Sequence, residues 1–193
     1  MNNAIKLQPD LALAYNNRGI AYKSLGQYQQ AIEDYNQAIH LKPDLALAYN
    51  NRGIAYKSLG QHQRAIEDYN KAIRLKPDCA QAYVSRGLAY TDLRQYQRAI
   101  EDYNEAIRIK PDYSEAYYNR GSAYINLDQY QCAIEDCKEA IRLKPDYAGA
   151  YNNRGIAYLI SGNNKLGCRD AQKACALGVC KALELAKGKG LCR

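Results

Sequence analysis

Four of the seven cysteines crowd the C-terminal end and form the densest group of reactive side chains: Cys168, Cys175, Cys180 and Cys192. Their spacing lacks the paired two-residue gaps of a zinc ribbon, so we expect no metal site. Disulfide bonds and free thiols both stay open. A terminal helix that folds back favours Cys175–Cys180 nested within Cys168–Cys192, one of the pairings that four cysteines allow. Oxidised cysteines would indicate an exported or periplasmic protein, and free thiols a cytoplasmic one.

Asparagine recurs at intervals of 34 residues. The row consists of Asn17, Asn51, Asn119 and Asn153, and Asn16, Asn50 and Asn152 directly precede three of its members. Ser85 takes the one missing place in the row. A carboxamide both donates and accepts hydrogen bonds, so solvent-facing asparagines could hold a peptide backbone whatever its side chains. The alternative is that they are polar residues tolerated on a wet helix surface.

An arginine row shares this period: Arg18, Arg52, Arg86, Arg120 and Arg154. An acidic pair, such as Glu33-Asp34, follows each of the first four arginines. An arginine near a helix crossing is partly desolvated and needs a carboxylate partner. We therefore predict repeated structural Arg–Asp ion pairs between two helices, with a row of anion-binding sites as the alternative.

The remaining residues do not suggest catalysis. The two histidines, His40 and His62, stand where other repeats carry Arg or Tyr. No Ser/His/Asp or Cys/His set recurs at helical or loop spacing, and no glycine-rich phosphate loop is present. The sequence therefore predicts a protein that is not an enzyme and needs no cofactor and no metal.

The net charge of +7 is concentrated at one end. Residues 163–193 carry seven Lys or Arg against Asp170 and Glu184. A nucleic-acid-binding protein usually shows a basic stripe along its binding face, so we expect a solvated terminal helix and no nucleic-acid partner. No apolar run approaches the roughly 18 residues of a membrane-spanning helix, so we also expect no membrane partner.

Two helices per 34-residue unit must position these side chains. Pro-Asp marks the period, at Pro9, Pro43, Pro77, Pro111 and Pro145. Residues 14–25 show the three- and four-residue apolar spacing of an amphipathic helix, and Gly26 is suited to a left-handed C-cap. Residues 28–41 repeat the pattern, and Pro43 prevents the helix from continuing.

The pattern Tyr-x2-Arg-Gly-x2-Tyr, then Ala-x3-Tyr, then Pro at period 34 resembles the tetratricopeptide repeat, with Tyr for the family's usual Trp and Phe. The resemblance implies an all-α, right-handed superhelical solenoid of antiparallel helix hairpins with a C-terminal capping helix. The C-terminal cysteines resemble the Cys-bearing caps of some bacterial members. The Asn row is similar to the asparagine ladder of the O-GlcNAc transferase repeats, which grips extended peptides by their backbone.

The period also predicts the boundaries of the repeats. Residues 1–11 match the second helix of a preceding repeat, which suggests a truncated or longer protein. Four repeats follow at 12–45, 46–79, 80–113 and 114–147, then a degenerate repeat at 148–181 and a C-terminal cap and tail at 182–193. Because the fifth repeat has Gly167, Ala171 and Val179 in place of Ala, Tyr and Pro, we expect it to pack less well than the others.

The family resemblance implies a protein–protein interaction scaffold that holds a protein or extended peptide in a concave groove lined by the first helices. Apolar positions of those helices, Ile20, Ile54 and Leu88, are expected to contribute to the groove with the Asn row. The competing hypothesis is a structural module that forms weak homo-oligomers by stacking through its uncapped N-terminal edge.

Overall fold

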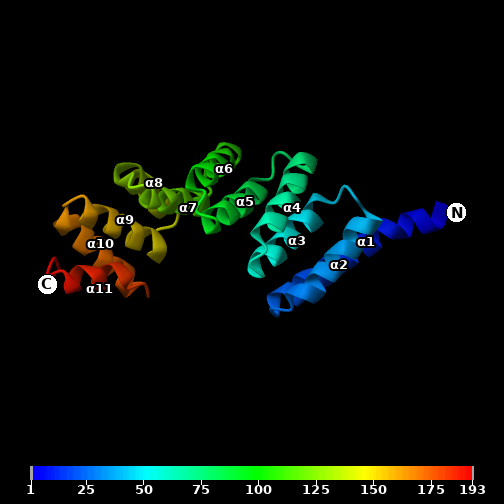
Figure 1. The fold of residues 1–193 in the computed structure, drawn as a ribbon, viewed down its shortest axis with the longest axis horizontal. Helices are drawn as coiled ribbons and strands as arrows, with labels where there is room; N and C mark the ends of the chain where they lie inside the picture. Colours follow the sequence, from blue (N-terminus) through cyan, green and yellow to red (C-terminus); the bar gives the residue numbers. More distant parts are fainter. Residues whose placement is uncertain (1, 193) are drawn as a thin grey trace. The chain divides into compact units, whose positions relative to one another are not determined.

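The computed structural model describes residues 2–192, and it describes side chains from residue 11 onward. Within these residues the regular secondary structure is entirely helical, in eleven helices (Figure 1). They are α1 (Asn2–Ser24), α2 (Tyr28–Leu41), α3 (Ala46–Ser58), α4 (His62–Leu75), α5 (Ala80–Asp92), α6 (Tyr96–Ile109), α7 (Ser114–Asn126), α8 (Tyr130–Leu143), α9 (Ala148–Ile160), α10 (Asn164–Ala176) and α11 (Lys181–Gly188). The predicted all-α class is confirmed.

The chain divides into two compact units, Met1–Arg94 and Gln95–Arg193. In the first unit, helices α1 to α5 each pack on their sequence neighbours, and α3 also contacts α1 and α5. In the second unit, α6 to α11 pack in the same way, and α9 also contacts α7 and α11. Each unit is therefore a stack in which a helix hairpin contacts only adjacent hairpins, as in a solenoid.

The turn inside each hairpin depends on one residue with positive φ. Gly26 has φ 74°, and the N–H of Gln27 donates to the carbonyl of Tyr22 at 2.9 Å, which closes the end of α1. Arg94 and Asp128 replace this glycine in later repeats and take nearly the same conformation, with φ 58° and 57°. The hairpin turn therefore keeps its shape where glycine is absent, at the steric cost that a side chain has in this region.

The core of a typical repeat is a tyrosine ring packed on a glycine. Tyr35 and Tyr69 are fully buried on α2 and α4. A Cβ added to Gly19 would lie 2.6 Å from Cε1 of Tyr35, and one added to Gly53 would lie 2.6 Å from Cε1 of Tyr69. The glycine column is therefore required because the first helix meets the ring of the second helix with no space for a methyl group.

The fifth repeat packs differently from the expectation. A Cβ on Gly155 would lie 3.2 Å from the backbone N of Ala171 and the backbone O of Gly167, so α9 and α10 meet backbone to backbone. A Cβ on Gly167 would lie 2.6 Å from Cγ of Leu159. Leu159 packs with Ala186 of α11 and with Cys192. The substitutions therefore bring the two helices closer and make room for the terminal helix instead of loosening the repeat.

The N-terminal segment also differs from the expectation. Residues 1–11 were expected to be the second helix of a preceding repeat, separate from the first helix of repeat 1. In the structure α1 runs without interruption from Asn2 to Ser24, through Pro9.

Candidate functional site

The first helices of adjacent repeats are joined by asparagine side chains. Nδ2 of Asn51 on α3 donates to Oδ1 of Asn16 on α1 at 3.0 Å, and both residues are buried. Nδ2 of Asn16 in turn lies 3.4 Å from Oδ1 of Asn17. These amides satisfy one another inside the seam between two helices, where an unpaired polar group would be costly.

A second asparagine seam closes the C-terminal end. Oδ1 of Asn152 on α9 accepts from the backbone N–H of Ala182 at 2.9 Å. Ala182 lies in the first turn of α11, whose backbone donors have no partner within the helix. Asn152 therefore anchors the start of the capping helix, and its Nδ2 lies 3.4 Å from Oδ1 of Asn153.

The expectation that the asparagines face solvent is wrong for most of them. The buried members are Asn16, Asn50, Asn51, Asn119 and Asn152, whereas Asn17 is exposed and Asn153 is half-buried. The physical reason is that adjacent first helices approach closely, so the asparagine positions fall between helices. Helical periodicity places the residues on one face of a helix, but it does not show what covers that face.

Asn50 differs from the other buried asparagines of the first unit because its acceptor is unused. Its side chain is 6% exposed, and Oδ1 has no hydrogen-bond partner among the described residues. By analogy with the Asn16–Asn51 pair, the amide that would bond Asn50 belongs to the residue at position 85. That residue is Ser85, which is shorter and buried. The interruption of the Asn row therefore leaves a buried carbonyl oxygen unpaired.

A cavity of about 230 Å³ opens at this place, between the start of α3 and the start of α5. Besides Asn50, its walls include Ala46, Leu47, Ala72 and Cys79, with Lys76 and Gln81 also lining it. Leu47 is 49% exposed. The cavity therefore combines an apolar wall with one unpaired acceptor, which is the usual composition of a small binding site.

Leu47 was not predicted as a site residue, although the sequence contains a signal for it. Leu13, Leu47, Gln81 and Glu115 occupy the same position in successive repeats. A position that accepts Gln and Glu faces solvent, so leucine there is an exposed apolar side chain. The predicted apolar positions Ile20, Ile54 and Leu88 are half-buried on the first helices.

Within the repeats, four of the five arginines are each held by an aspartate on the following helix. In the second repeat Nε and Nη2 of Arg52 donate to the two carboxylate oxygens of Asp68, at 2.8 and 2.7 Å. Arg18 with Asp34, Arg120 with Asp136, and Arg154 with Asp170 form the same bidentate pair. Burial alone would lower the pKa of Arg52, but the bond and charge of Asp68 outweigh it and raise the pKa.

The remaining guanidinium donor binds the preceding repeat. Nη1 of Arg52 donates to Oδ1 of Asn36 at 2.6 Å, and Arg86 and Arg120 make the same bond, each at 2.6 Å, to Asn70 and Asn104. The guanidinium of Arg52 also lies over the rings of Tyr49 and Tyr56. In the inner repeats this row therefore holds neighbouring hairpins together. No role was predicted for Asn36, Asn70 and Asn104, although they recur at the 34-residue period.

The C-terminal cysteines are joined in two nested disulfides. Cys168 on α10 bonds Cys192 of the tail, and Cys175 bonds Cys180 across the turn before α11. Cys79, Cys132 and Cys137 carry free thiols. Burial raises the pKa of the Cys137 thiol to about 12, so it is neutral at physiological pH.

Among residues 2–192, no three His, Cys, Asp or Glu side chains lie close enough together to hold a metal ion. No helix in this range is both long and apolar enough to cross a lipid bilayer.

Comparison with known families gives tetratricopeptide-repeat matches along most of the chain. A model described as TPR repeat matches residues 21–60 and 87–128. Two models described as tetratricopeptide repeat match residues 46–79 and 114–147, and residues 1–33. No curated protein matches the chain.

Solved structures with the same fold cover nearly the whole chain. The crystal structure of MamA protein is 27% identical, with 93% of this chain and 95% of that chain covered and a TM-score of 0.75. YrrB, described as a TPR protein with an unusual peptide-binding site, is 22% identical, with coverage of 96% and 97% and a TM-score of 0.75. pilF of Pseudomonas aeruginosa is 18% identical, with coverage of 95% and 86% and a TM-score of 0.85.

Proposed function

We propose that this chain, which belongs to the tetratricopeptide-repeat family, is an interaction scaffold that binds a peptide segment of another protein against α3 and α5. The observation that carries the proposal is the unpaired Oδ1 of Asn50 beside a cavity with apolar walls. Leaving a buried acceptor unpaired costs about 1–3 kcal/mol. A backbone N–H of a bound peptide would remove this cost and would seat a small apolar side chain against Leu47.

The proposal assigns different roles to the asparagines of the Asn row and to those that directly precede them. Asn16, Asn51 and Asn152 use their amides to join helices, so we assign the peptide contact to Asn50. Asn17 and Asn153 keep exposed surface and stay candidates for further contacts, as does Asn119, whose Nδ2 is buried and unpaired among the described residues. Ile20, Ile54 and Leu88 supply half-buried apolar surface on the same helices.

The test uses a phage-displayed library of random peptides, selected on the full unreduced chain. We expect Asn50→Ala to weaken the selected peptides by about two- to tenfold, because one neutral hydrogen bond contributes about 0.5–1.5 kcal/mol. The free energy of unfolding should not fall, because the deleted acceptor has no partner in the free protein.

Asn16→Ala is the matched control, since it removes the same side chain one repeat earlier. It should lower stability by breaking the Asn16–Asn51 bond and leave peptide affinity unchanged. Selection of no peptide, or equal affinity of Asn50→Ala and the parent chain, would reject the proposal.

A structural module is the second candidate, and the N-terminal edge favours it. Leu11, Ala14, Tyr15 and Arg18 line a cavity of about 230 Å³. The side chain of Arg18 is 59% exposed, against 19% for Arg52, because no asparagine of a preceding hairpin covers it among the described residues. A second copy stacked on this edge would give a sedimentation coefficient that rises with concentration, and Leu11→Glu would abolish the rise.

A further inference from the structure

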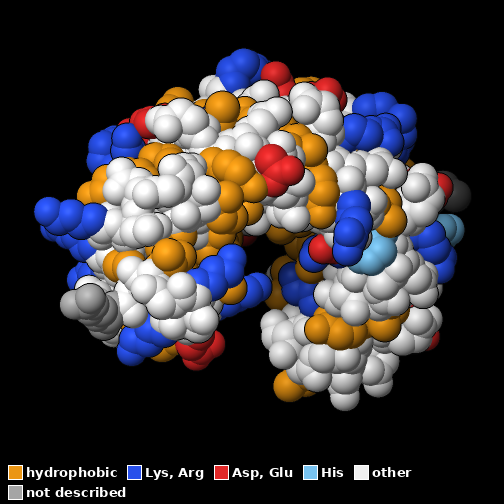
Figure 2. Space-filling view, turned by 60° about the vertical axis from the view of Figure 1, so that its left-hand side comes forward, with side chains coloured by type: hydrophobic (Ala, Val, Ile, Leu, Met, Phe, Trp, Pro, Cys, Tyr) orange, Lys and Arg blue, Asp and Glu red, His pale blue; other side chains and the backbone are white. Residues whose placement is uncertain are grey.

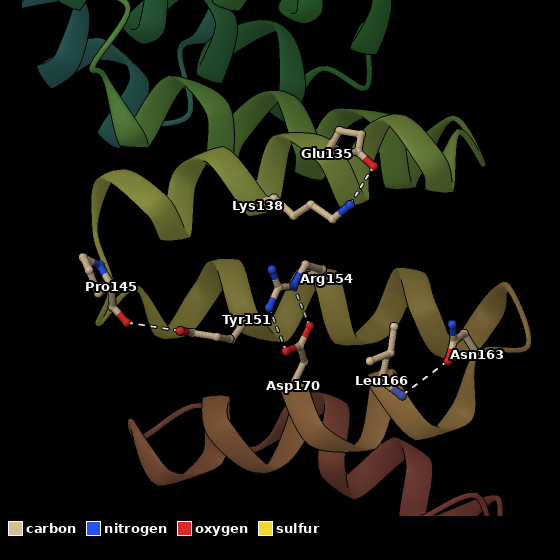
Figure 3. Close-up of polar contacts among 8 residues, drawn as sticks. All are labelled: Glu135, Lys138, Pro145, Tyr151, Arg154, Asn163, Leu166 and Asp170. Atoms are coloured by element: carbon tan, nitrogen blue, oxygen red, sulfur yellow. Dashed lines mark hydrogen bonds and ion pairs between the residues drawn. The ribbon is translucent and has the colours of Figure 1, made fainter.

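The surface along α9 and α10 differs from the equivalent surface of the other repeats in the sign of its charges. A cavity of about 680 Å³ lies along α9 and α10. Tyr151, Arg154 and Tyr158 of α9 and Arg169, Asp170 and Lys173 of α10 line it. Figure 3 shows Arg154 and Asp170 joined across the two helices, with Tyr151 on the same helix as Arg154. The cavity therefore has two aromatic rings, three basic groups and one carboxylate.

Arg154 keeps one unpaired donor at this cavity. Its Nε and Nη2 donate to Asp170 at 2.6 and 2.9 Å, but Nη1 has no partner among the described residues. In the inner repeats the equivalent Nη1 donates to Asn36, Asn70 or Asn104. The residue at this place before α9 is Lys138, which donates instead to Glu135 at 2.9 Å (Figure 3). Because Lys138 stands where the first three repeats have an asparagine acceptor, Nη1 of Arg154 is available to bind an anion.

Arg169 reverses the charge of its column. The four preceding repeats carry Glu33, Glu67, Glu101 and Glu135 at this position. Arg169 and Lys173 are exposed and make no hydrogen bond or ion pair with any residue that the structure describes. Because Arg154 and Asp170 compensate each other, the cavity keeps about two positive charges. In Figure 2 the Lys and Arg side chains are spread over the face shown, and the charge of this cavity follows from its lining residues.

We propose that this cavity along α9 and α10 binds a phosphate monoester group. Such a group carries about 1.5 to 2 negative charges at pH 7 and offers three acceptor oxygens, which matches the unpaired Arg154 donor, Arg169 and Lys173. Guanidinium groups hold phosphate through paired hydrogen bonds. The volume exceeds that of a bare ion and falls within the range of small-molecule sites, so Tyr151 and Tyr158 can flank the organic part of the ester.

The experiment titrates phenyl phosphate into the full, unreduced chain and follows binding by calorimetry. Inorganic phosphate and benzoate are titrated in parallel. Arg169→Glu restores the residue that four other repeats carry, so it should fold normally. We expect it to weaken phenyl phosphate binding at least tenfold, since hydrogen bonds to charged groups contribute about twice as much as neutral ones. Lys173→Gln should weaken binding by a smaller factor.

Lys165→Gln is the matched control, because it removes one exposed positive charge from α10 outside the cavity. Retained binding in this variant and in Asn50→Ala would support the proposal and separate it from peptide binding at α3. Stronger binding of phenyl phosphate than of inorganic phosphate would identify an ester as the ligand, and equal binding a free phosphate. No binding of either phosphate, equal losses in Arg169→Glu and Lys165→Gln, or benzoate binding as strong as phenyl phosphate binding would overturn it.

Discussion

Asn16 and Asn50 occupy equivalent positions in adjacent repeats but have different surroundings. Asn16 accepts a hydrogen bond from Asn51, whereas Oδ1 of Asn50 has no partner. The 34-residue period predicts that their backbones are equivalent. It cannot predict the bond, because the bond also requires a matching residue in the next repeat, and Ser85 stands there. The candidate site therefore arises from a departure from the repeat, which the sequence shows without revealing its effect.

Ser85→Asn should complete the missing bond of the first unit. The new amide would reach Oδ1 of Asn50 as Asn51 reaches Asn16, and the free energy of unfolding should rise by about 0.5–1.5 kcal/mol. Peptide affinity should fall because the acceptor is already used. Urea unfolding and a binding titration of the variant check the two effects. A loss of stability would mean that the space at position 85 cannot hold the longer side chain.

At the scale of the helix, the repeat columns predicted most of what the structure contains. The recurring Gly19 and Pro-Asp positions located the hairpins, because glycine lets two helices pack closely and proline prevents a helix from continuing. The packing of the two helices was not predicted in the fourth and fifth repeats, where other residues replace the buried tyrosine equivalent to Tyr35. In the fourth repeat Cys137 replaces the ring, and in the fifth Ala171 lets the helix backbones approach. A sequence pattern shows that the ring is missing, but the new helix distance depends on how the neighbours move.

The second and fourth repeats provide a matched test of this packing. A methyl group at Gly53 would lie 2.6 Å from the buried ring of Tyr69, so Gly53→Ala should lower the free energy of unfolding by about 1–3 kcal/mol. At Gly121 the nearest atoms lie 3.3 to 3.4 Å away, among them Sγ of Cys137. Gly121→Ala should therefore be neutral, or gain the roughly 0.5–1 kcal/mol that alanine contributes in a helix. Urea unfolding of both variants measures the difference, and equal losses would exclude the ring as the cause.

At the scale of the whole molecule, both disulfide bonds lie at the C-terminal end of the second unit. The C-terminal tail is tied to α10 by Cys168–Cys192, and α11 is tied to the turn before it by Cys175–Cys180. Repeats and hairpins were predictable from the period because each one contacts only its neighbours. The continuous α1 was not, because the behaviour of an end depends on partners that the pattern does not include.

Reduction should destabilise the C-terminal end. Closing the loop between Cys168 and Cys192, which are 24 residues apart, contributes about 3 kcal/mol in the chain-entropy model. We therefore expect reductant to lower the melting temperature and to speed proteolysis after α10. Titration of the unreduced, denatured protein should find three thiols, those of Cys79, Cys132 and Cys137. Seven thiols, with a melting temperature unaffected by reductant, would contradict this expectation and remove the inference of an oxidising compartment.

Disulfide bonds close only the second of the two units, so the two units should differ in thermal stability. A stack held by neighbour contacts opens from its ends, because an end hairpin has only one partner to lose. Cys168–Cys192 and the bond from Asn152 to α11 slow this at the C-terminal end, whereas Leu11 and Arg18 have no such cover among the described residues. We therefore expect the first unit to open at a lower temperature than the second. The Asn50 cavity lies in the first unit and the Arg154 cavity in the second. On heating, a bound peptide should therefore be released at a lower temperature than a ligand of the Arg154 cavity.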